Sequence, residues 1–157
     1  MSHDQQFQHD QQFQHDQQFQ HDRPRPQHAT PASQASQDLL GRLGFDTVWA
    51  EALRQTTTVH VDGLTPRPAR VVRTDRGACD LLDGSGPQRA TWGADVLAAV
   101  AEDPLAVPST GDWVVLQDWP DGHTTVEAVL PRRTCVVRAQ VNGSSSGQVL
   151  AANVDVV

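Results

Sequence analysis

GDWVVLQDWPDGHTTVEAVL, residues 111–130, holds two short apolar runs around a turn. We predict one strand at Trp113–Asp118 and a second at His123–Leu130. Between them, WPDG at residues 119–122 is typical of a turn, because proline holds φ at about −65° where the turn requires it. This stretch therefore predicts two short strands joined by a tight turn.

Three further strands precede this pair, at Ala69–Thr74, Ala78–Asp83 and Gln88–Trp92, separated by glycine-containing turns. The period then changes, and Ala94–Ala101 is predicted as a helix that stops before Pro104. Five short strands with one helix between the third and fourth is the order of an OB-fold barrel, a mainly β architecture whose closure removes sheet edges. An SH3-like barrel also accommodates five strands, although the inserted helix suits it less well.

Short helices are expected before the barrel, in residues 38–58. DLLGRLG at residues 38–44 reads as a helical turn closed by glycine. Asp46 suits the N-cap of a second helix through Gln55, because its carboxylate can accept from the free amides of the first turn. Beside Phe45, we expect an apolar face made of Val48, Trp49, Ala52 and Leu53.

Residues 1–37 are predicted to form a disordered Gln/His-rich repeat tail. The hexapeptide HDQQFQ occurs three times, at residues 3–8, 9–14 and 15–20. Such a stretch buries too little apolar surface to offset the entropy of ordering it. The repeated histidines do not suit a metal site, because in a helix they point in different directions and in a strand they lie roughly 20 Å apart.

The chain has 12 arginines, no lysine and 19 acidic residues, for a net charge of −7. A globally acidic chain is not a general polyanion binder, so any nucleic-acid contact requires a local arginine cluster. Cys79 and Cys135 belong to no metal-binding motif, which indicates two free thiols. Without an apolar run of about 18 residues or a secretory signal, we expect a cytoplasmic protein with no membrane partner.

The end of the chain is expected to begin another domain. Residues 140–148 are polar and rich in glycine and serine, and Val149–Val157 reads as a largely apolar strand. A near-continuous apolar run is typical of a strand buried on both faces of a parallel α/β sheet. We therefore interpret residues 59–139 as the barrel domain, and residues 140–157 as a linker and the first strand of a truncated α/β domain.

Several separated motifs, in this order, resemble a known family. GDWVVL (111–116), TVEAVLPRRT (125–134), Val137-Arg138 and QVLAANVDVV (148–157) resemble ribosome small-subunit-dependent GTPase A, the RsgA/YjeQ-like family. The resemblance covers residues 38–157, and residues 89–108 are similar to its high-GC Gram-positive branch. It implies an OB-fold, a circularly permuted GTPase domain and a zinc-binding helical region, in a protein that hydrolyses GTP during late maturation of the small ribosomal subunit.

The resemblance also implies partners, namely the small ribosomal subunit and its 16S-type rRNA near the decoding region, with no DNA. The loops that would approach the RNA are Asp75–Gly77, Gly84–Pro87 and Trp119–Gly122.

The chain also departs from the family pattern. A phosphate loop needs a lysine that reaches the nucleotide phosphates, and the chain has none. GSSSG at residues 143–147 imitates such a loop only in composition, and both N-K-x-D and the Cys/His zinc cluster are missing. We predict no catalytic, cofactor-binding or metal-binding residue here, and expect GTP, magnesium and zinc only for the full-length parent. Its coding sequence should continue past Val157 with N-K-x-D, then G-x-x-x-x-G-K-[ST].

The candidate RNA-binding residues are arginines and one tryptophan. One arginine group accompanies the first strand and another follows the fifth, and their convergence on one face would let them contact phosphates or stack on bases. The alternative is that they are solvated and paired with Asp75, Asp80 or Glu127. Trp113 and Trp92 suit a core, whereas Trp119 lies in a turn where it can stack on an unpaired base. The candidates are Arg70, Arg73, Arg76, Trp119, Arg132, Arg133 and Arg138.

Two function classes remain open. The first is the rRNA-binding portion of a ribosome-assembly GTPase, and the second is a stand-alone barrel that binds protein and has no enzymatic activity. A hydrolase with a Ser/His/Asp set has little support, because neither His60 nor His123 lies in a nucleophile motif.

Overall fold

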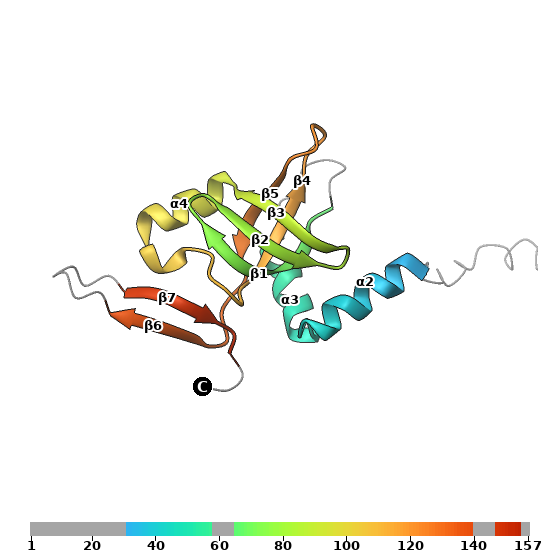
Figure 1. The fold of residues 1–157 in the computed structure, drawn as a ribbon, viewed down its shortest axis with the longest axis horizontal. Helices are drawn as coiled ribbons and strands as arrows, with labels where there is room; N and C mark the ends of the chain where they lie inside the picture. Colours follow the sequence, from blue (N-terminus) through green and yellow to red (C-terminus); the bar gives the residue numbers. More distant parts are fainter. Residues whose placement is uncertain (1–30, 58–64, 140–146, 155–157) are drawn as a thin grey trace, which may run out of the picture. The chain divides into compact units, whose positions relative to one another are not determined.

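Five strands close into the predicted barrel. The computed structural model describes residues 31–57, 65–139 and 147–154. Hydrogen-bonded neighbours around the barrel run β1-β2-β3-β5-β4, and the β3–β5 pair is parallel while the others are antiparallel. This topology is that of the OB-fold. The strands are β1 (Arg67–Asp75), β2 (Ala78–Asp83), β3 (Gly86–Trp92), β4 (Trp113–Asp118) and β5 (Thr124–Val129) (Figure 1).

The strand boundaries follow the predicted turns closely. Gly77 has φ 71° and Gly122 has φ 88°, so glycine supplies the left-handed backbone in the β1–β2 and β4–β5 turns. β3 begins at Gly86, two residues before the predicted Gln88, and Pro87 pairs with Leu82 of β2. The predicted barrel range begins at residue 59, and residues 58–64 lie outside the described residues.

Helix α4 (Ala94–Glu102) connects β3 to the short helix η1 (Pro104–Ala106), which leads towards β4. Val96 of α4 is buried with the inward side chains of the strands, and Figure 1 shows the helix beside β5 at one end of the barrel. We call this group the barrel core. Its buried members are Ala69, Val71, Cys79, Leu81, Ala90, Val96, Val114, Leu116 and Val126.

Helix α3 (Thr47–Thr56) packs on the outer side of β4. The Asp46 carboxylate accepts hydrogen bonds from the amides of Val48 and Trp49, both at 3.0 Å, which confirms the predicted N-cap. Trp49, Trp113, Val115 and Leu130 are the buried residues of a second cluster, which we call the helix-side core. Val48 was wrongly placed on this apolar face: it is 61% exposed, because it lies about 100° around the helix from Trp49.

Helix α2 (Pro31–Arg42) begins seven residues before the predicted start at Asp38. Proline suits the first position of a helix, where its missing N–H costs no intrahelical hydrogen bond. The helix has no fully buried residue, so its first turns lack the apolar period that the prediction relied on. The helix lies close to the β2–β3 turn at Gly84, where an added Cβ would lie 2.9 Å from the Cβ of Ser36. Residues 1–30, with the HDQQFQ repeats, lie outside the described residues.

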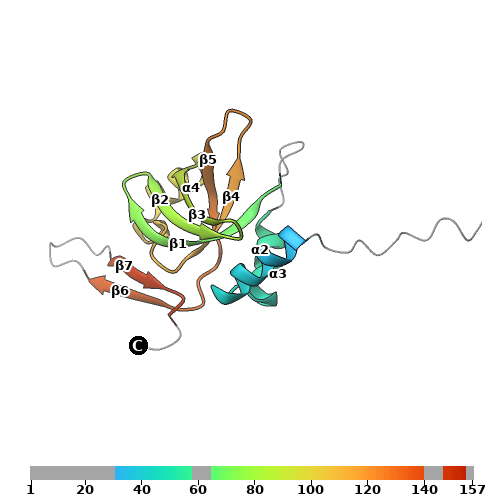
Figure 2. The same cartoon turned by 45° about the vertical axis from the view of Figure 1, so that its right-hand side comes forward.

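Strands β6 (Cys135–Ala139) and β7 (Gly147–Ala152) form a separate antiparallel pair (Figure 2). The C-terminal strand therefore has a partner, formed by the apolar segment that we assigned to the barrel domain. Most of the predicted polar linker, residues 140–146, and the last residues, 155–157, lie outside the described part.

Both cysteines are free, as predicted. The structure adds that Cys79 is buried and Cys135 is exposed. Burial raises the pKa of the Cys79 thiol, although the Trp92 indole donates a hydrogen bond to its sulfur at 3.4 Å.

In the described ranges, no group of His, Cys, Asp and Glu side chains can hold a metal ion. None of the helices there has the length and apolar character needed to cross a membrane.

Candidate nucleic-acid interface

The candidate arginines do not share one face. The structure places them in three surroundings. These are a buried network at the α4–β4 connection, a polar pocket beside α3, and exposed positions on β1, β6 and the β1–β2 turn.

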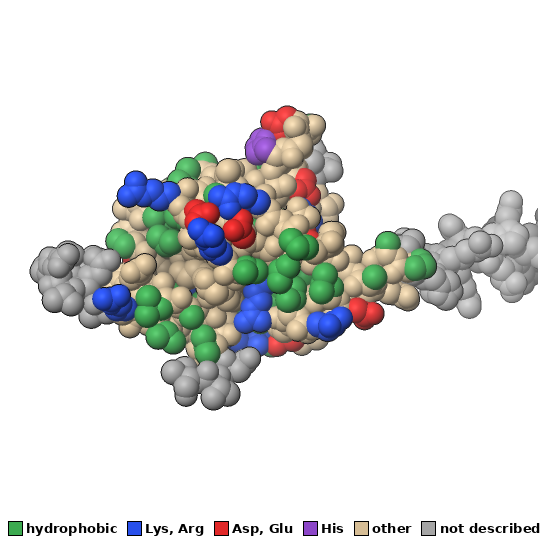
Figure 3. Space-filling view, viewed as in Figure 1, with side chains coloured by type: hydrophobic (Ala, Val, Ile, Leu, Met, Phe, Trp, Pro, Cys, Tyr) green, Lys and Arg blue, Asp and Glu red, His purple; other side chains and the backbone are tan. Residues whose placement is uncertain are grey.

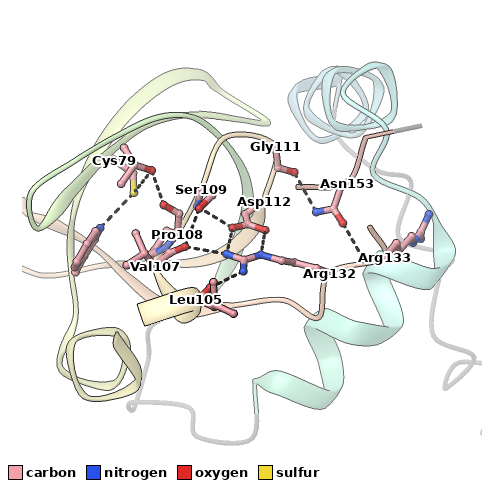
Figure 4. A network of polar contacts seen from close by, with 12 residues as sticks. Cys79, Leu105, Val107, Pro108, Ser109, Gly111, Asp112, Arg132, Arg133 and Asn153 are labelled. Atoms are coloured by element: carbon pink, nitrogen blue, oxygen red, sulfur yellow. Dashed lines mark hydrogen bonds and ion pairs between the residues drawn. The ribbon is translucent and has the colours of Figure 1, made fainter. Parts of the chain in front are cut away.

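Arg132 lies in the buried network, as Figure 4 shows. Its guanidinium donates to both carboxylate oxygens of Asp112, at 2.8 and 2.7 Å, and the Asp112 side chain is 0% exposed. Two more donors reach the carbonyl oxygens of Leu105 and Val107, at 2.6 and 2.8 Å. Asp112 also accepts from the amide of Ser109 at 2.8 Å. Arg132 therefore ties the α4–β4 connection to the segment after β5, and its donors are committed within the protein.

Arg70 and Arg133 both line a polar pocket of about 360 Å³. Arg133 forms a two-pronged ion pair with Asp46, at 2.8 and 2.6 Å, and its guanidinium carbon lies 4.4 Å from the Trp49 ring centroid. The hydrogen bond from Arg133, helped by the Trp49 amide, lowers the pKa of Asp46 from 3.8 to about 2. The two predicted arginine groups therefore meet in part at this pocket.

Arg70 is held by backbone oxygens on both sides of the same pocket. Its guanidinium donates to the carbonyl oxygen of Leu43, after α2, and to that of Asn153 at 3.3 Å. Its guanidinium carbon also lies 5.8 Å from the ring centroid of Trp113. Arg70 thus links the helices, β1 and the end of β7.

Asn153 is a junction that sequence reasoning missed. Its backbone has φ 53°, a left-handed value that asparagine tolerates better than most residues. Its side chain donates to the Gly111 carbonyl at 3.1 Å and accepts from the Arg133 amide at 2.9 Å. Gly111, with φ 92°, lies so close that a Cβ would overlap the carbonyl oxygen of Ala152. The sequence offered one indication of this junction: Gly111 directly precedes the predicted strand at Trp113, and Asn153 interrupts the apolar C-terminal segment.

Arg73, Arg76 and Arg138 are exposed. Arg73 pairs with Asp75 at 3.1 Å, and its side chain is 70% exposed. Arg89 of β3, which was not among the candidates, bridges Asp75 and Asp80. Basic and acidic side chains accordingly lie close together on the face shown in Figure 3. The predicted alternative, arginines paired with Asp75 or Asp80, is therefore what the structure shows for Arg73 and Arg89.

Trp119 lies in the turn between β4 and β5 and is half-buried. Its indole N–H donates to the Thr125 hydroxyl at 2.7 Å, which fixes the ring. His123 stacks on it, with ring centroids 5.7 Å apart and planes 9° apart. Trp113 lies in the helix-side core, as expected. Trp119 and His123 therefore form a partly exposed aromatic pair in this turn, and the hydrogen bond to Thr125 fixes its orientation.

Two of these features lie where OB-folds commonly bind nucleic acid, which is the β2–β3 face together with the β1–β2 and β4–β5 loops. Arg76 lies in the β1–β2 turn, and no ion pair or hydrogen bond is recorded for its side chain among the described residues. The aromatic pair lies in the β4–β5 turn. Arg138 lies on β6, outside the barrel. The side chains in or near these OB-fold positions are Arg73, Arg76, Arg89, Trp119 and His123.

The relatives agree with the resemblance seen in the sequence. A protein of Streptomyces coelicolor named "Small ribosomal subunit biogenesis GTPase RsgA" is 41% identical over 125 residues, 79% of this chain and 31% of its own length. Proteins of the same name from Streptomyces avermitilis and Syntrophotalea carbinolica are 43% and 38% identical over 86 and 96 residues, 55% and 57% of this chain and 22% and 26% of their own lengths.

No protein-family model matches the chain. The chain spans about a third or less of the length of these curated relatives. Over the matched region, the chain is homologous to the N-terminal portion of these GTPases.

Proposed function

We propose that the barrel is the rRNA-binding portion of a cytoplasmic ribosome-assembly GTPase and contacts RNA of the small ribosomal subunit. One observation carries this proposal: the chain forms an OB-fold barrel within a region 41% identical to a protein named as a GTPase of small-subunit biogenesis. OB-folds are frequent nucleic-acid binders, through their β2–β3 face and adjoining loops. The whole protein's GTP hydrolysis and its role in late subunit maturation belong to the same proposal.

The proposed contacts are local, because the chain has a net charge of −7. Arg73 and Arg76 supply positive charge beside the β1–β2 turn, and phosphates can compete with Asp75 for the exposed Arg73. Trp119, stacked on His123, offers a face for an unpaired base, a contact worth about 1–3 kcal/mol where it forms. Affinity for RNA is therefore expected to be modest and sensitive to salt.

Changing Arg73 and Arg76 together to Gln tests the RNA contact. Binding of the chain to an isolated fragment of small-subunit rRNA is measured at several salt concentrations. Each phosphate contact contributes about 0.7 on single strands and about 0.9 on B-form duplexes to the slope of log K against log salt. Loss of two contacts should therefore make the slope shallower by about 1–2.

The matched control is Arg54→Gln, on α3, whose side chain is 73% exposed and pairs only with Glu51 among the recorded contacts. It removes one charge from a helix that precedes the barrel, outside the proposed RNA contacts, and should leave the slope unchanged. If the double variant and the control behave alike, the RNA contact is not at this edge. A parent chain that shows no salt dependence favours the alternative, a stand-alone protein-binding barrel.

The chain by itself is expected neither to bind nor to hydrolyse GTP, because it has no lysine for a phosphate loop and no N-K-x-D motif. Isothermal titration with GTP and magnesium should give no heat of binding. Addition of the chain to small subunits should not raise their GTP turnover. Micromolar binding of GTP would contradict this prediction.

A further inference from the structure

An apolar cavity of about 450 Å³ lies between α4, η1 and β5. It is separate from the exposed arginines and from the β1–β2 and β4–β5 turns that carry the proposed RNA contacts. Its apolar lining comes from α4, from η1, from the end of β5 and from the residue that follows β5. The apolar lining residues are Val96, Ala99, Leu105, Ala106, Ala128, Val129 and Leu130.

The charges around this cavity are acidic. Asp95, Asp103 and Glu127 contribute carboxylates to its lining. Arg132 also lines it, but that positive charge is paired with the buried Asp112. Phosphates would be repelled by three carboxylates, whereas lysine or arginine side chains would be attracted, so the cavity and the RNA-facing edge suit opposite ligand charges.

Next to the cavity, strand β5 continues past its short pairing with β3. Its parallel pairing with β3 covers only Thr125 and Val126, and the last contact there is the hydrogen bond from the Gly93 amide to the Val126 carbonyl, at 2.8 Å. Beyond that point, Ala128 and Val129 pair with β4, and Glu127 lies at a bulge in the β4–β5 register. No described strand pairs with residues 127–129 on the other side of β5. An extended segment can add to such an edge through backbone hydrogen bonds, with its alternate side chains entering a neighbouring pocket.

We propose that this cavity is a docking site for an extended, lysine- or arginine-rich segment of a partner protein. The segment would lie along residues 127–129 of β5, place apolar side chains into the cavity and direct its basic side chains to Asp95, Asp103 and Glu127. An apolar anchor surrounded by complementary charge is the arrangement that gives a small interface both affinity and specificity. This surface allows the same barrel to engage RNA on one side and a basic protein segment on another.

The probe for this proposal is a short synthetic peptide in which lysine and leucine alternate. Its binding to the isotope-labelled chain is followed by NMR, with expected shift changes at the methyl groups of Val96 and Val129 and at the amides of residues 127–129. The double variant Asp95→Asn and Glu127→Gln should weaken binding about tenfold or more, because two attractive charges are lost. Ala99→Leu, which fills the cavity from an exposed helix position, should weaken it by a similar factor.

Glu102→Gln is the matched control, because it removes the same charge from the same helix at an exposed position outside the cavity lining. It should bind the peptide within about twofold of the parent chain. The proposal is overturned if the peptide shifts other residues, if both cavity variants bind as well as the parent, or if a peptide with glutamate in place of lysine binds equally. Equal shifts at the cavity on adding the rRNA fragment would also overturn it, since they would assign the site to RNA.

Discussion

Arg132 and Arg76 lie near opposite ends of the barrel sequence and show how differently one protein uses the same side chain. Arg132 is surrounded by four internal hydrogen bonds and a fully buried carboxylate, and only 17% of its side chain is exposed. Arg76 lies on an exposed turn with no recorded partner among the described residues. The availability of an arginine for a ligand is therefore set by the acceptors that the fold places around it.

Arg132→Ala should lower the free energy of unfolding by about 3 kcal/mol, because it leaves the carboxylate of Asp112 buried without its countercharge. Urea unfolding followed by tryptophan fluorescence measures the loss. Arg138→Ala, at an exposed position on β6, is the control and should change stability by no more than about 0.5 kcal/mol. Equal losses in the two variants would mean that the buried pair has no special structural role.

The Asp46–Arg133 pair represents an intermediate case, exposed but well bonded. The folded-state pKa of Asp46 is lowered from 3.8 to about 2, so its stabilising contribution is present above the ordinary value and is lost as pH falls towards 2. The stability difference between the parent chain and Asp46→Asn should therefore shrink between about pH 4 and pH 2, as measured by urea unfolding at several pH values.

Arg133→Gln sharpens this test, because the hydrogen bond from Arg133 is the largest cause of the lowered pKa. In the Arg133→Gln background, the additional effect of Asp46→Asn should vary less with pH over the same range. A stability difference that stays constant down to pH 2 would show that the pair does not hold the carboxylate charged.

The smallest effect is expected at the exposed edge. Arg73→Gln with Arg76→Gln should change the free energy of unfolding by less than about 0.5 kcal/mol, because exposed ion pairs such as Arg73–Asp75 contribute little. The same variant is expected to reduce the salt dependence of RNA binding. A thermal unfolding comparison with the parent chain measures the stability, and a loss similar to that of Arg132→Ala would place these arginines among the structural ones.

Local patterns were enough to predict the barrel. Short strands bounded by glycine turns, and a change to helical period between the third and fourth strands, predicted the closed order seen in the structure. The N-cap at Asp46 was equally local, since its acceptor and the amides it binds are two and three residues apart. Prediction was wrong where local patterns were weak, as at the start of α2 and at Val48.

The candidate site was less predictable, because its residues depend on contacts between distant segments. Arg132 and Asp112 are 20 residues apart, and Arg133 and Asp46 are 87 apart. Nothing in the sequence around Arg132 distinguishes it from Arg133, yet one lies in a buried network and the other over the Trp49 ring.

By itself, the amino-acid sequence determined the strand order, the turns and the relationship to the N-terminal portion of RsgA proteins, because these follow from residue periodicity and motifs within short segments. Tertiary structure alone decided which arginines remain exposed and that Asn153 joins β7 to the barrel. It also decided that a cavity with an apolar lining and three carboxylates lies beside β5. The physical reason is that burial and charge pairing are properties of surroundings assembled from distant parts of the chain.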